Sequence, residues 1–281
     1  MKSFTEKYGP WALVTGASSG MGTEFARRLA EKGLNVVLLA RREDRLRSLA
    51  VELERDYSAK TRVVAVDLTR DDLLDSIRDA TDDIEVGLLV NNAGFATSGN
   101  LLDNDLSAEL AMLHVNSRAP LVLSHHFGRR MREQGKGGII FVASTVAYSG
   151  APGWSNYAAT KAFDLTLSDG IAHELRGDGV SVLTVSPGPT QTEFWQVAGG
   201  KPLFALTPER VVRAALSNLG HRSTIVPGLI NKLIVLSTRF TPRWLNAVIF
   251  GHVVKLMQRG KARPKRNVCV GSPTLANAVH K

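Results

Sequence analysis

Tyr157 and Lys161 lie four residues apart in the stretch Tyr-Ala-Ala-Thr-Lys. On a helix, this spacing places both side chains on one face, where they can meet a common molecule. A tyrosine hydroxyl has an ordinary pKa near ~10, and a neighbouring ammonium favours the phenolate and draws that pKa toward neutrality. The pair could therefore move a proton to or from an oxygen atom. Because the same spacing occurs on many helices by chance, other motifs must decide whether it is functional.

A glycine-rich turn follows a short apolar strand at 12–14 and precedes a segment of helical period that begins at residue 24. Glycines allow a tight turn and a close approach to a pyrophosphate, and the free N–H groups of the opening helix face the anion. The alternative is a tight connection without a ligand. The residues of this turn that we expect to bind a dinucleotide are Gly16, Ser18, Ser19, Gly20, Met21 and Gly22.

Two arginines, Arg41 and Arg42, follow the next apolar strand at 36–40, where dinucleotide folds contact the adenosine ribose. An acidic residue at this place accepts hydrogen bonds from a ribose 2′-hydroxyl, whereas a guanidinium pairs with a 2′-phosphate. The chain has no acidic residue before Glu43, which favours NADP(H) over NAD(H). The alternative is that both arginines form the solvated start of a helix.

Two further apolar strands carry small and polar residues at their carboxyl ends, where ligands bind in open α/β sheets. The strand at 88–90 leads into Asn91-Asn92-Ala93-Gly94, and the strand at 139–142 presents Ser144. Together with the motifs above, these residues resemble the classical short-chain dehydrogenase/reductase family, in the branch of 3-oxoacyl-thioester reductases and hydroxysteroid dehydrogenases. The resemblance covers about residues 8 to 226 and includes Asn116 and the stretch Pro187-Gly188-Pro189-Thr190-Gln191-Thr192.

The resemblance implies a role for each matched residue. Tyr157 is implied to be the general acid or base, and Ser144 to hydrogen-bond the reacting oxygen. Lys161 is implied to hold the nicotinamide ribose and lower the Tyr157 pKa, and Asn116 to anchor a water that relays protons to Lys161. The remaining positions that the family implies for cofactor contact, besides Tyr157 and Lys161, are Asp67, Leu68, Asn92, Ala93, Gly94, Pro187, Gly188 and Thr190.

A chain of 281 residues with 44% hydrophobic residues is long and apolar enough for one large α/β domain. Strands and helices alternate, with helices expected at 42–57, 70–80, 106–132, 156–177 and 208–219 and later strands at 180–185 and 222–226. This alternation predicts a Rossmann-type, doubly wound parallel sheet over residues 8–226. The segment 190–207 interrupts the pattern and is placed to cover an apolar substrate, with Phe95, Val146 and Trp154 as further walls. The alternative for this segment is a packed surface connection.

The C-terminal part of the chain is basic and apolar. From Arg210 to Lys281 there are thirteen Lys or Arg and no Asp or Glu, whereas the first 209 residues hold the other 22 basic and all 26 acidic residues. Its apolar runs are too short to span a bilayer. We expect a helical extension at 227–260 that covers substrate, lies on an anionic membrane surface or contacts a second subunit, and a disordered tail at 261–281.

Other features limit the function classes. The single cysteine, Cys269, excludes an intrachain disulfide and suits a reducing compartment. The seven histidines form no metal-binding spacing, and no nucleic-acid-binding motif is found. The first residues lack the apolar run of a signal peptide, so we expect a cytoplasmic protein, peripheral on the cytosolic membrane face if the basic extension binds lipid.

The combined interpretation is an NADP(H)-dependent oxidoreductase that acts on CH–OH groups. It is expected to reduce a ketone or aldehyde of an apolar substrate, such as a 3-oxoacyl thioester or a steroid, or to oxidise the alcohol, in lipid metabolism. The family resemblance implies a homodimer or homotetramer. The alternative is a non-catalytic NADP-binding protein that its basic C-terminus recruits to membranes or partners; an intact set of Asn116, Ser144, Tyr157 and Lys161 argues against it.

Overall fold

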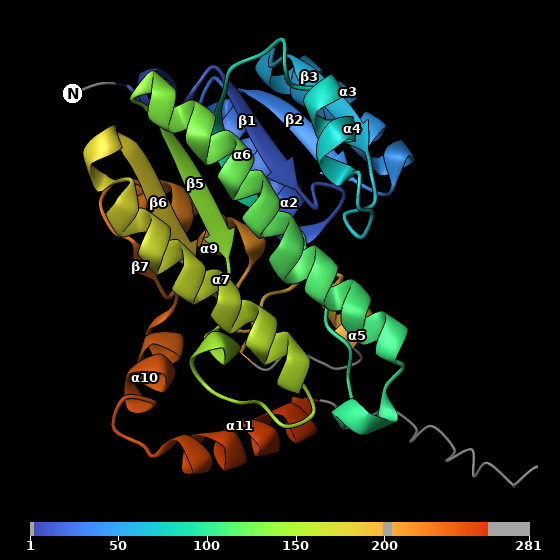
Figure 1. Ribbon diagram of the computed structural model, residues 1–281, viewed down its shortest axis with the longest axis vertical. Helices are drawn as coiled ribbons and strands as arrows, with labels where there is room; N and C mark the ends of the chain where they lie inside the picture. The colour runs from blue at the N-terminus through green and yellow to red at the C-terminus, as the bar shows by residue number, and fades with distance from the viewer. Residues whose placement is uncertain (1–2, 199–203, 258–281) are drawn as a thin grey trace, which may run out of the picture.

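One parallel sheet of seven strands organises the protein (Figure 1). The computed structural model describes residues 3–198 and 204–257. Apolar register neighbours such as Leu13 and Val37, or Leu89 and Ile139, are fully buried, as expected for a parallel sheet that is covered on both faces. In the order β3-β2-β1-β4-β5-β6-β7, the strands are β1 (Trp11–Thr15), β2 (Asn35–Ala40), β3 (Thr61–Ala65), β4 (Val86–Asn91), β5 (Gly137–Val142), β6 (Val180–Val185) and β7 (Thr224–Ile225).

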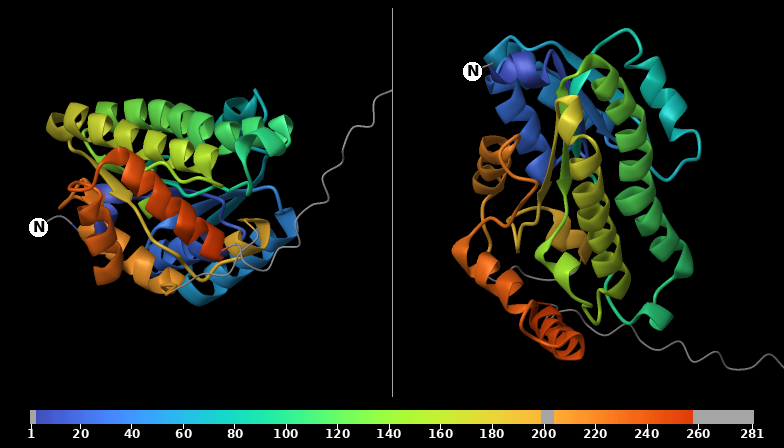
Figure 2. Two further views of the ribbon diagram at one scale, coloured as in Figure 1. Left: turned by 90° about the horizontal axis from the view of Figure 1, so that it is seen from below. Right: turned by 60° about the vertical axis from the view of Figure 1, so that its left-hand side comes forward.

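Helices cover both faces of the sheet, which confirms the predicted doubly wound Rossmann-type fold (Figure 2). One face packs against α2 (Gly20–Glu31), α3 (Glu43–Tyr57) and α9 (Pro208–Asn218), and the other against α4 (Leu73–Asp79), α6 (Ala119–Gln134) and α7 (Ser155–Glu174). Phe25 fills the first of these two cores, and Phe127 and Phe141 fill the second. A short α1 (Phe4–Tyr8) precedes the sheet and begins with a capping box between Ser3 and Glu6.

The helix predicted at 106–132 is interrupted. It divides into α5 (Leu106–Leu113), a π-helical turn at His114–Arg118 and α6. A π turn adds a residue without breaking the helical run, so the hydrophobic period of the sequence did not reveal it. The turn contains Asn116, which is fully buried, and this is the reason that the interruption matters for the site.

Smaller differences concern the ends of elements. The helix predicted at 156–177 ends at Glu174 and is followed by a 3-10 turn at Arg176–Asp178, and the strand predicted at 222–226 is reduced to the two residues of β7. Further 3-10 turns occur at Leu101–Asp103 and Thr145–Tyr148.

Three helices lie at the carboxyl ends of the strands: α8 (Phe194–Ala198), α10 (Leu229–Ser237) and α11 (Arg243–Met257). In Figure 1, α11 crosses this end of the molecule beneath the sheet. Within the predicted extension at 227–260, the residues of α10 and α11 are helical. Residues 258–260 and the predicted tail at 261–281, with Cys269, lie outside the described residues. The division into three parts stays a prediction. None of the described helices combines the length and the hydropathy that a membrane span requires.

Candidate active site

A cavity of about 610 Å³ lies at the carboxyl ends of the strands. Its volume is in the range of small-molecule and cofactor sites. Of the sequence-predicted site residues, only Gly22 and Asn116 do not line it. Those that do are Gly16, Ser18, Ser19, Gly20, Met21, Arg41, Arg42, Asp67, Leu68, Asn92, Ala93, Gly94, Ser144, Tyr157, Lys161, Pro187, Gly188 and Thr190.

The glycine-rich turn is packed too closely for side chains. A Cβ atom on Gly22 would lie 2.1 Å from the Gly16 carbonyl oxygen, and one on Gly16, whose φ is +68°, would lie 2.9 Å from the Ala93 Cα. Thr15 Oγ1 accepts hydrogen bonds of 3.0 Å from the backbone N–H groups of Asn92 and Ala93, which ties the turn to the end of β4. The turn thus leaves the N-terminus of α2 open to the cavity, an arrangement that fits the pyrophosphate of a dinucleotide.

The side-chain amide of Asn92 contributes to this anchoring, because its Nδ2 donates to the Thr15 carbonyl oxygen at 2.8 Å. Asn92 was predicted from the family resemblance as a cofactor contact. It lines the cavity, but its amide nitrogen is engaged by the protein.

Arginines gather where the adenosine end of a dinucleotide is expected. Arg42 donates from Nε and Nη2 to Ser18 Oγ at 3.2 and 3.1 Å, and its Nη1 lies 2.9 Å from Glu193 Oε2. Glu193 also accepts from Arg45 Nη1 at 2.7 Å. Arg41 lines the cavity beside Arg42. This cluster of cations suits a 2′-phosphate, and one carboxylate already occupies part of it.

Asp67 faces the cavity from the loop after β3. Its Oδ1 accepts hydrogen bonds of 2.9 Å from both the backbone N–H and the hydroxyl of Thr69. These bonds, the backbone bond foremost, lower the pKa of Asp67 and keep it ionised. A fixed carboxylate at this place can accept hydrogen bonds from an adenine or ribose, while the adjacent Leu68 supplies an apolar contact.

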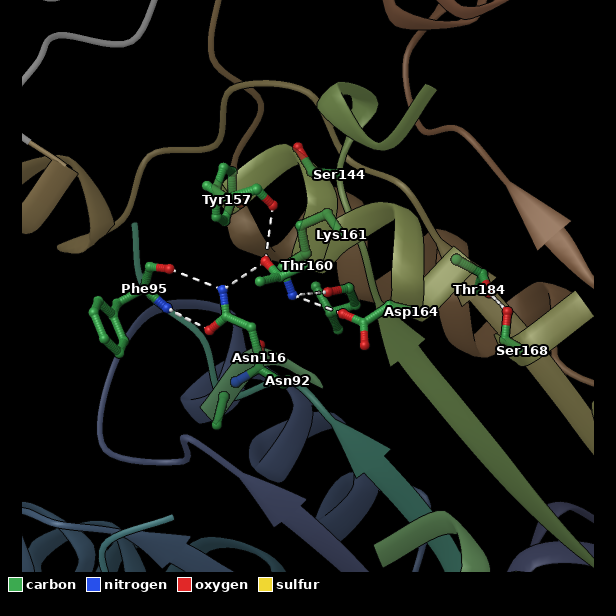
Figure 3. Close-up of polar contacts among 12 residues, drawn as sticks. Asn92, Phe95, Asn116, Ser144, Tyr157, Thr160, Lys161, Asp164, Ser168 and Thr184 are labelled. Carbon is green, nitrogen blue, oxygen red and sulfur yellow. Dashed lines mark hydrogen bonds and ion pairs between the residues drawn. The ribbon is translucent and has the colours of Figure 1, made fainter. Parts of the chain in front are cut away.

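Tyr157, Lys161 and Ser144 meet at the other end of the cavity. Tyr157 and Lys161 lie one turn apart on α7, and both are buried, at 8% and 4% exposure. Lys161 Nζ donates to the Val142 carbonyl oxygen at 2.8 Å and lies 3.0 Å from Asp164 Oδ2 (Figure 3). Ser144 caps the 3-10 turn after β5, where its hydroxyl accepts from Val146 N at 3.4 Å.

Lys161 lowers the pKa of Tyr157, as predicted, but the net shift in this structure is upward. Burial of the hydroxyl raises the pKa of Tyr157 above its ordinary 10.0, and the opposing effects of Lys161 and Ser144 do not overcome it. Asp164 adds to the increase because its negative charge opposes a phenolate. The sequence spacing revealed the ammonium next to the phenol but not the extent to which both are desolvated.

Asn116 is fully buried, and its side chain joins two segments instead of facing the cavity. Its Oδ1 accepts from Phe95 N at 3.1 Å, while its Nδ2 donates to Phe95 O at 2.9 Å and to Thr160 Oγ1 at 3.1 Å (Figure 3). Thr160 in turn donates to the Tyr157 carbonyl oxygen at 2.8 Å. Asn116 thus positions the Phe95 loop against α7, whereas the water relay implied by the family stays a prediction.

Aromatic side chains surround the Tyr157 ring. The rings of Trp154 and Phe194 lie 6.0 and 5.5 Å from it between centroids, and Trp195 packs against both of them. Phe95 and Val146 also line the cavity, as the sequence predicted. Phe194 and Trp195 belong to the segment expected to cover the substrate, of which residues 199–203 lie outside the described part.

Besides Glu193, which pairs with Arg42, two contributions to the site were missed by the sequence reasoning. The first is Asp164, which the Lys-x-x-Asp spacing could have placed beside Lys161 on one face of a helix. The second is the set of individual side chains with which the C-terminal helices close the cavity. From α10 and α11, the lining residues are Asn231, Ile234, Ser237, Asn246, Ile249, Phe250, Val253, Val254 and Met257. Within residues 3–198 and 204–257, no group of three or more potential metal ligands lies together.

The chain as a whole is similar to several known proteins. A family model described as short chain dehydrogenase matches residues 10–201. The 7beta-hydroxysteroid dehydrogenase of Collinsella aerofaciens is 33% identical over 234 residues, which cover 81% of this chain and 89% of the relative. The very-long-chain 3-oxoacyl-CoA reductase of Anas platyrhynchos is 32% identical over 222 residues, 76% of this chain and 70% of the relative.

A solved structure of a short-chain dehydrogenase from Sphingobium yanoikuyae in complex with NADPH is also similar. It superposes with a TM-score of 0.76 at 32% identity, covering 91% of this chain and 99% of that one. The alternative of a non-catalytic cofactor-binding protein finds no support in these relatives, which are named as dehydrogenases or reductases.

Proposed function

Since the chain belongs to the short-chain dehydrogenase family and is an oxidoreductase acting on CH–OH groups, we propose that it uses NADP(H) to interconvert an apolar ketone or aldehyde and its alcohol. The observation that carries this proposal is that the glycine-rich turn, Tyr157, Lys161 and Ser144 line one continuous cavity with an aromatic wall. Arg41 and Arg42 at its adenosine end and the NADPH complex of a relative support NADP(H) as the cofactor.

Each residue of the site has a chemical task in this proposal. A bound NADPH would supply the hydride for the carbonyl carbon. In reduction, the Tyr157 hydroxyl donates its proton to the carbonyl oxygen, while the Ser144 hydroxyl donates a hydrogen bond to the same oxygen and stabilises its developing negative charge. Lys161 stabilises the phenolate that remains and binds the ribose. The burial of Tyr157 keeps it protonated and suits its role as the acid.

The substrate class that we propose is a steroid or a 3-oxoacyl thioester. The cavity wall consists of aromatic and aliphatic side chains from α8 and α11, which favours a large apolar substrate over a sugar or a polar acid. The two relatives, a hydroxysteroid dehydrogenase and a very-long-chain 3-oxoacyl-CoA reductase, support the same classes and a place in lipid metabolism.

The test is NADPH oxidation by the purified protein with ketosteroids, 3-oxoacyl thioesters and simple aldehydes. We expect turnover with one of the two large apolar classes and a loss of about 100- to 10,000-fold in Tyr157→Phe, because the proton donor is removed. Tyr148→Phe is the matched control, since Tyr148 is half-buried nearby and does not line the cavity. Tight NADPH binding without turnover of any carbonyl compound would contradict the proposal.

We also propose that the exposed face of α10 and α11 contacts an anionic membrane surface. Leu229, Phe240 and Trp244 on or between these helices are 73%, 82% and 69% exposed. The chain from Arg210 to Met257 contains seven Lys or Arg and no acidic residue, which matches an anionic surface in charge. Co-sedimentation with vesicles that contain or lack phosphatidylserine tests this; binding to neither kind would contradict it. The homodimer or homotetramer implied by the family stays a prediction, which light scattering can check.

A further inference from the structure

Asp164 is a buried carboxylate that the proposed chemistry does not use. It lies on α7 one turn beyond Lys161 and is 2% exposed. Its Oδ2 lies 3.0 Å from Lys161 Nζ, the same nitrogen that donates to the Val142 carbonyl oxygen. In Figure 3, Asp164 is on the side of Lys161 away from Tyr157. Lys161 is therefore held between a negative charge behind it and the catalytic phenol in front of it.

The contacts of Asp164 differ from those of a structural carboxylate. Its Oδ1 is buried and has no hydrogen-bond partner in the described part of the chain, although buried polar atoms are almost always paired. Two hydroxyls one turn away on the same helix bond elsewhere: Ser168 Oγ pairs with Thr184 Oγ1 on β6, and Thr160 Oγ1 donates to the Tyr157 carbonyl oxygen. A half-satisfied carboxylate costs stability, and an apolar side chain could fill the same space at lower cost. The ion pair with Lys161 is the one contact that explains its presence.

The charged groups near the phenol are few. Among the described residues, Lys161 and Asp164 are the charges that act on Tyr157, and the Ser144 hydroxyl is its hydrogen-bonding neighbour from the loop after β5. Only Lys161 acts on Asp164, whose pKa burial raises to about 6. Lys161 responds to Asp164 and Tyr157. Burial has the largest effect on the Tyr157 pKa, and the balance between the ammonium and the carboxylate modifies it.

We propose that Asp164 is a positioning residue that holds Lys161 in place beside Tyr157 and offsets part of the ammonium charge there. The inference rests on the proposed function. Reduction requires the protonated phenol, whereas oxidation requires the phenolate as base. An ammonium alone favours the phenolate, and a carboxylate paired with that ammonium weakens the effect.

The first experiment compares pH profiles of kcat/KM in both directions for the wild-type enzyme, Asp164→Asn and Asp164→Glu. Asparagine keeps the shape and removes the charge, so we expect the alkaline limb of reduction and the acid limb of oxidation to move down by about one pH unit. Asp164→Glu keeps the charge and should retain the wild-type limbs. Unchanged limbs in a folded Asp164→Asn would overturn the proposal.

The matched control is Asp169→Asn on the same helix. Asp169 is exposed and accepts from Thr224 Oγ1 at 3.0 Å, outside the cavity. The same chemical change there should leave both pH profiles where they are. An equal shift in Asp169→Asn would mean that any charge on α7 acts on Tyr157, which contradicts a specific role for Asp164.

A second measurement needs no turnover and no Asp164 variant. The difference in phenolate absorbance between the wild type and Tyr157→Phe, followed against pH, reports the ionisation of Tyr157 directly. In the cofactor-free enzyme we expect this ionisation above pH 10, the ordinary value for tyrosine. Ionisation near neutral pH would show that Lys161 acts without an offset and would overturn the proposal. Because this titration is independent of catalysis, it separates a failure of the Asp164 inference from a failure of the proposed reaction.

Discussion

At the scale of single residues, Arg42 is the side chain best placed to distinguish NADPH from NADH. Its guanidinium lines the cavity and is held by Ser18 Oγ at 3.1 and 3.2 Å. Charge-assisted hydrogen bonds to a phosphate contribute about 1.5–3 kcal/mol. We therefore expect Arg42→Ala to raise the KM for NADPH about 10- to 100-fold with little change for NADH, as measured by steady-state kinetics with both cofactors.

The control for Arg42 is Arg47→Ala on the same helix. Arg47 pairs with Glu43 at 2.5 Å on the exposed side of α3 and does not line the cavity. Its removal should leave both KM values unchanged. An equal loss of NADH and NADPH activity in Arg42→Ala would indicate a general role for Arg42 in folding the site and would contradict recognition of a 2′-phosphate.

The residue scale also separates what the sequence can predict from what it cannot. Residue types and spacings predicted the Tyr157–Lys161 pair and the glycine turn because these depend on local geometry and on motifs of fixed length. The sign of the Tyr157 pKa shift could not be predicted, since it depends on burial by α8 and on Asp164. Asn116 was predicted as a site residue from the family motif, but its bonds to Phe95 and Thr160 depend on how three segments meet.

At the scale of elements, Glu193 connects the start of α8 to α3. Its carboxylate pairs with Arg42 Nη1 at 2.9 Å and with Arg45 Nη1 at 2.7 Å, so it competes with a cofactor phosphate for the same cations. All three side chains are at least 39% exposed, and such pairs contribute up to about 1 kcal/mol. We expect Glu193→Gln to lower the KM for NADPH about two- to fivefold and to leave that for NADH unchanged.

Glu43→Gln serves as the control for this substitution, because Glu43 pairs with Arg47 on the exposed side of α3. A higher KM for NADPH in Glu193→Gln would mean that the carboxylate orients the arginines instead of competing for them. That result would contradict the prediction.

Glu109 on α5 is hydrogen-bonded to α7 and to the loop between β4 and α5. Its Oε1 accepts from Thr97 Oγ1 at 2.6 Å and Asn104 Nδ2 at 2.7 Å, and its Oε2 accepts from Asn156 Nδ2 at 2.7 Å. The residue is 4% exposed. In Glu109→Gln an amide NH₂ replaces one acceptor and faces donors, so we expect a loss of about 1–3 kcal/mol in the free energy of unfolding, measured by denaturant titration.

The pH dependence of the same variant checks the cause. Burial raises the pKa of Glu109, but the hydrogen bonds from Thr97, Asn156 and Asn104 outweigh it and set the folded-state pKa below 4.5. A depressed pKa stabilises the folded state above the unfolded pKa, and this contribution disappears as the pH falls through the folded pKa. The difference between wild type and Glu109→Gln should therefore shrink below about pH 4.5; a constant difference would contradict the role of the ionised carboxylate.

At the scale of the whole molecule, the sheet and its helices were predictable because strand and helix periods alternate regularly up to Ile225. The π turn before α6 and the shortness of β7 were not predictable. The π turn preserves the hydrophobic pattern of an ordinary helix, and the sequence around β7 has the hydrophobic pattern of a longer strand. The position of α10 and α11 could not be predicted from the sequence either. Their apolar residues have no single periodic face, because one set closes the cavity and another set is exposed, and only the folded chain separates the two.

The exposed apolar side chains of α10 and α11 lead to a prediction about the molecule as a whole. Ile234 and Ile249 line the cavity and are 42% and 48% exposed, so the cavity opens at the exposed face of α10 and α11. Arg239 and Arg243, where α10 leads into α11, are exposed as well. A bilayer in contact with this face could exchange an apolar substrate directly with the cavity. Each Lys or Arg near an anionic surface contributes about 1 kcal/mol, so Arg239→Glu with Arg243→Glu should weaken binding to phosphatidylserine vesicles more than tenfold.

The ionic-strength dependence of vesicle binding and a charge-matched control variant distinguish the membrane contact from a contact with a second copy of the chain. Wild-type binding should weaken with rising ionic strength, because salt screens surface charges. Arg129→Glu with Arg132→Glu makes the same change of charge near the C-terminal end of α6, far from α11 (Figure 1), and should leave binding unchanged. If Trp244→Ser instead converts a stable dimer into monomers in light scattering while vesicle binding is absent in the wild type, a second copy of the chain covers this face and the membrane contact is contradicted.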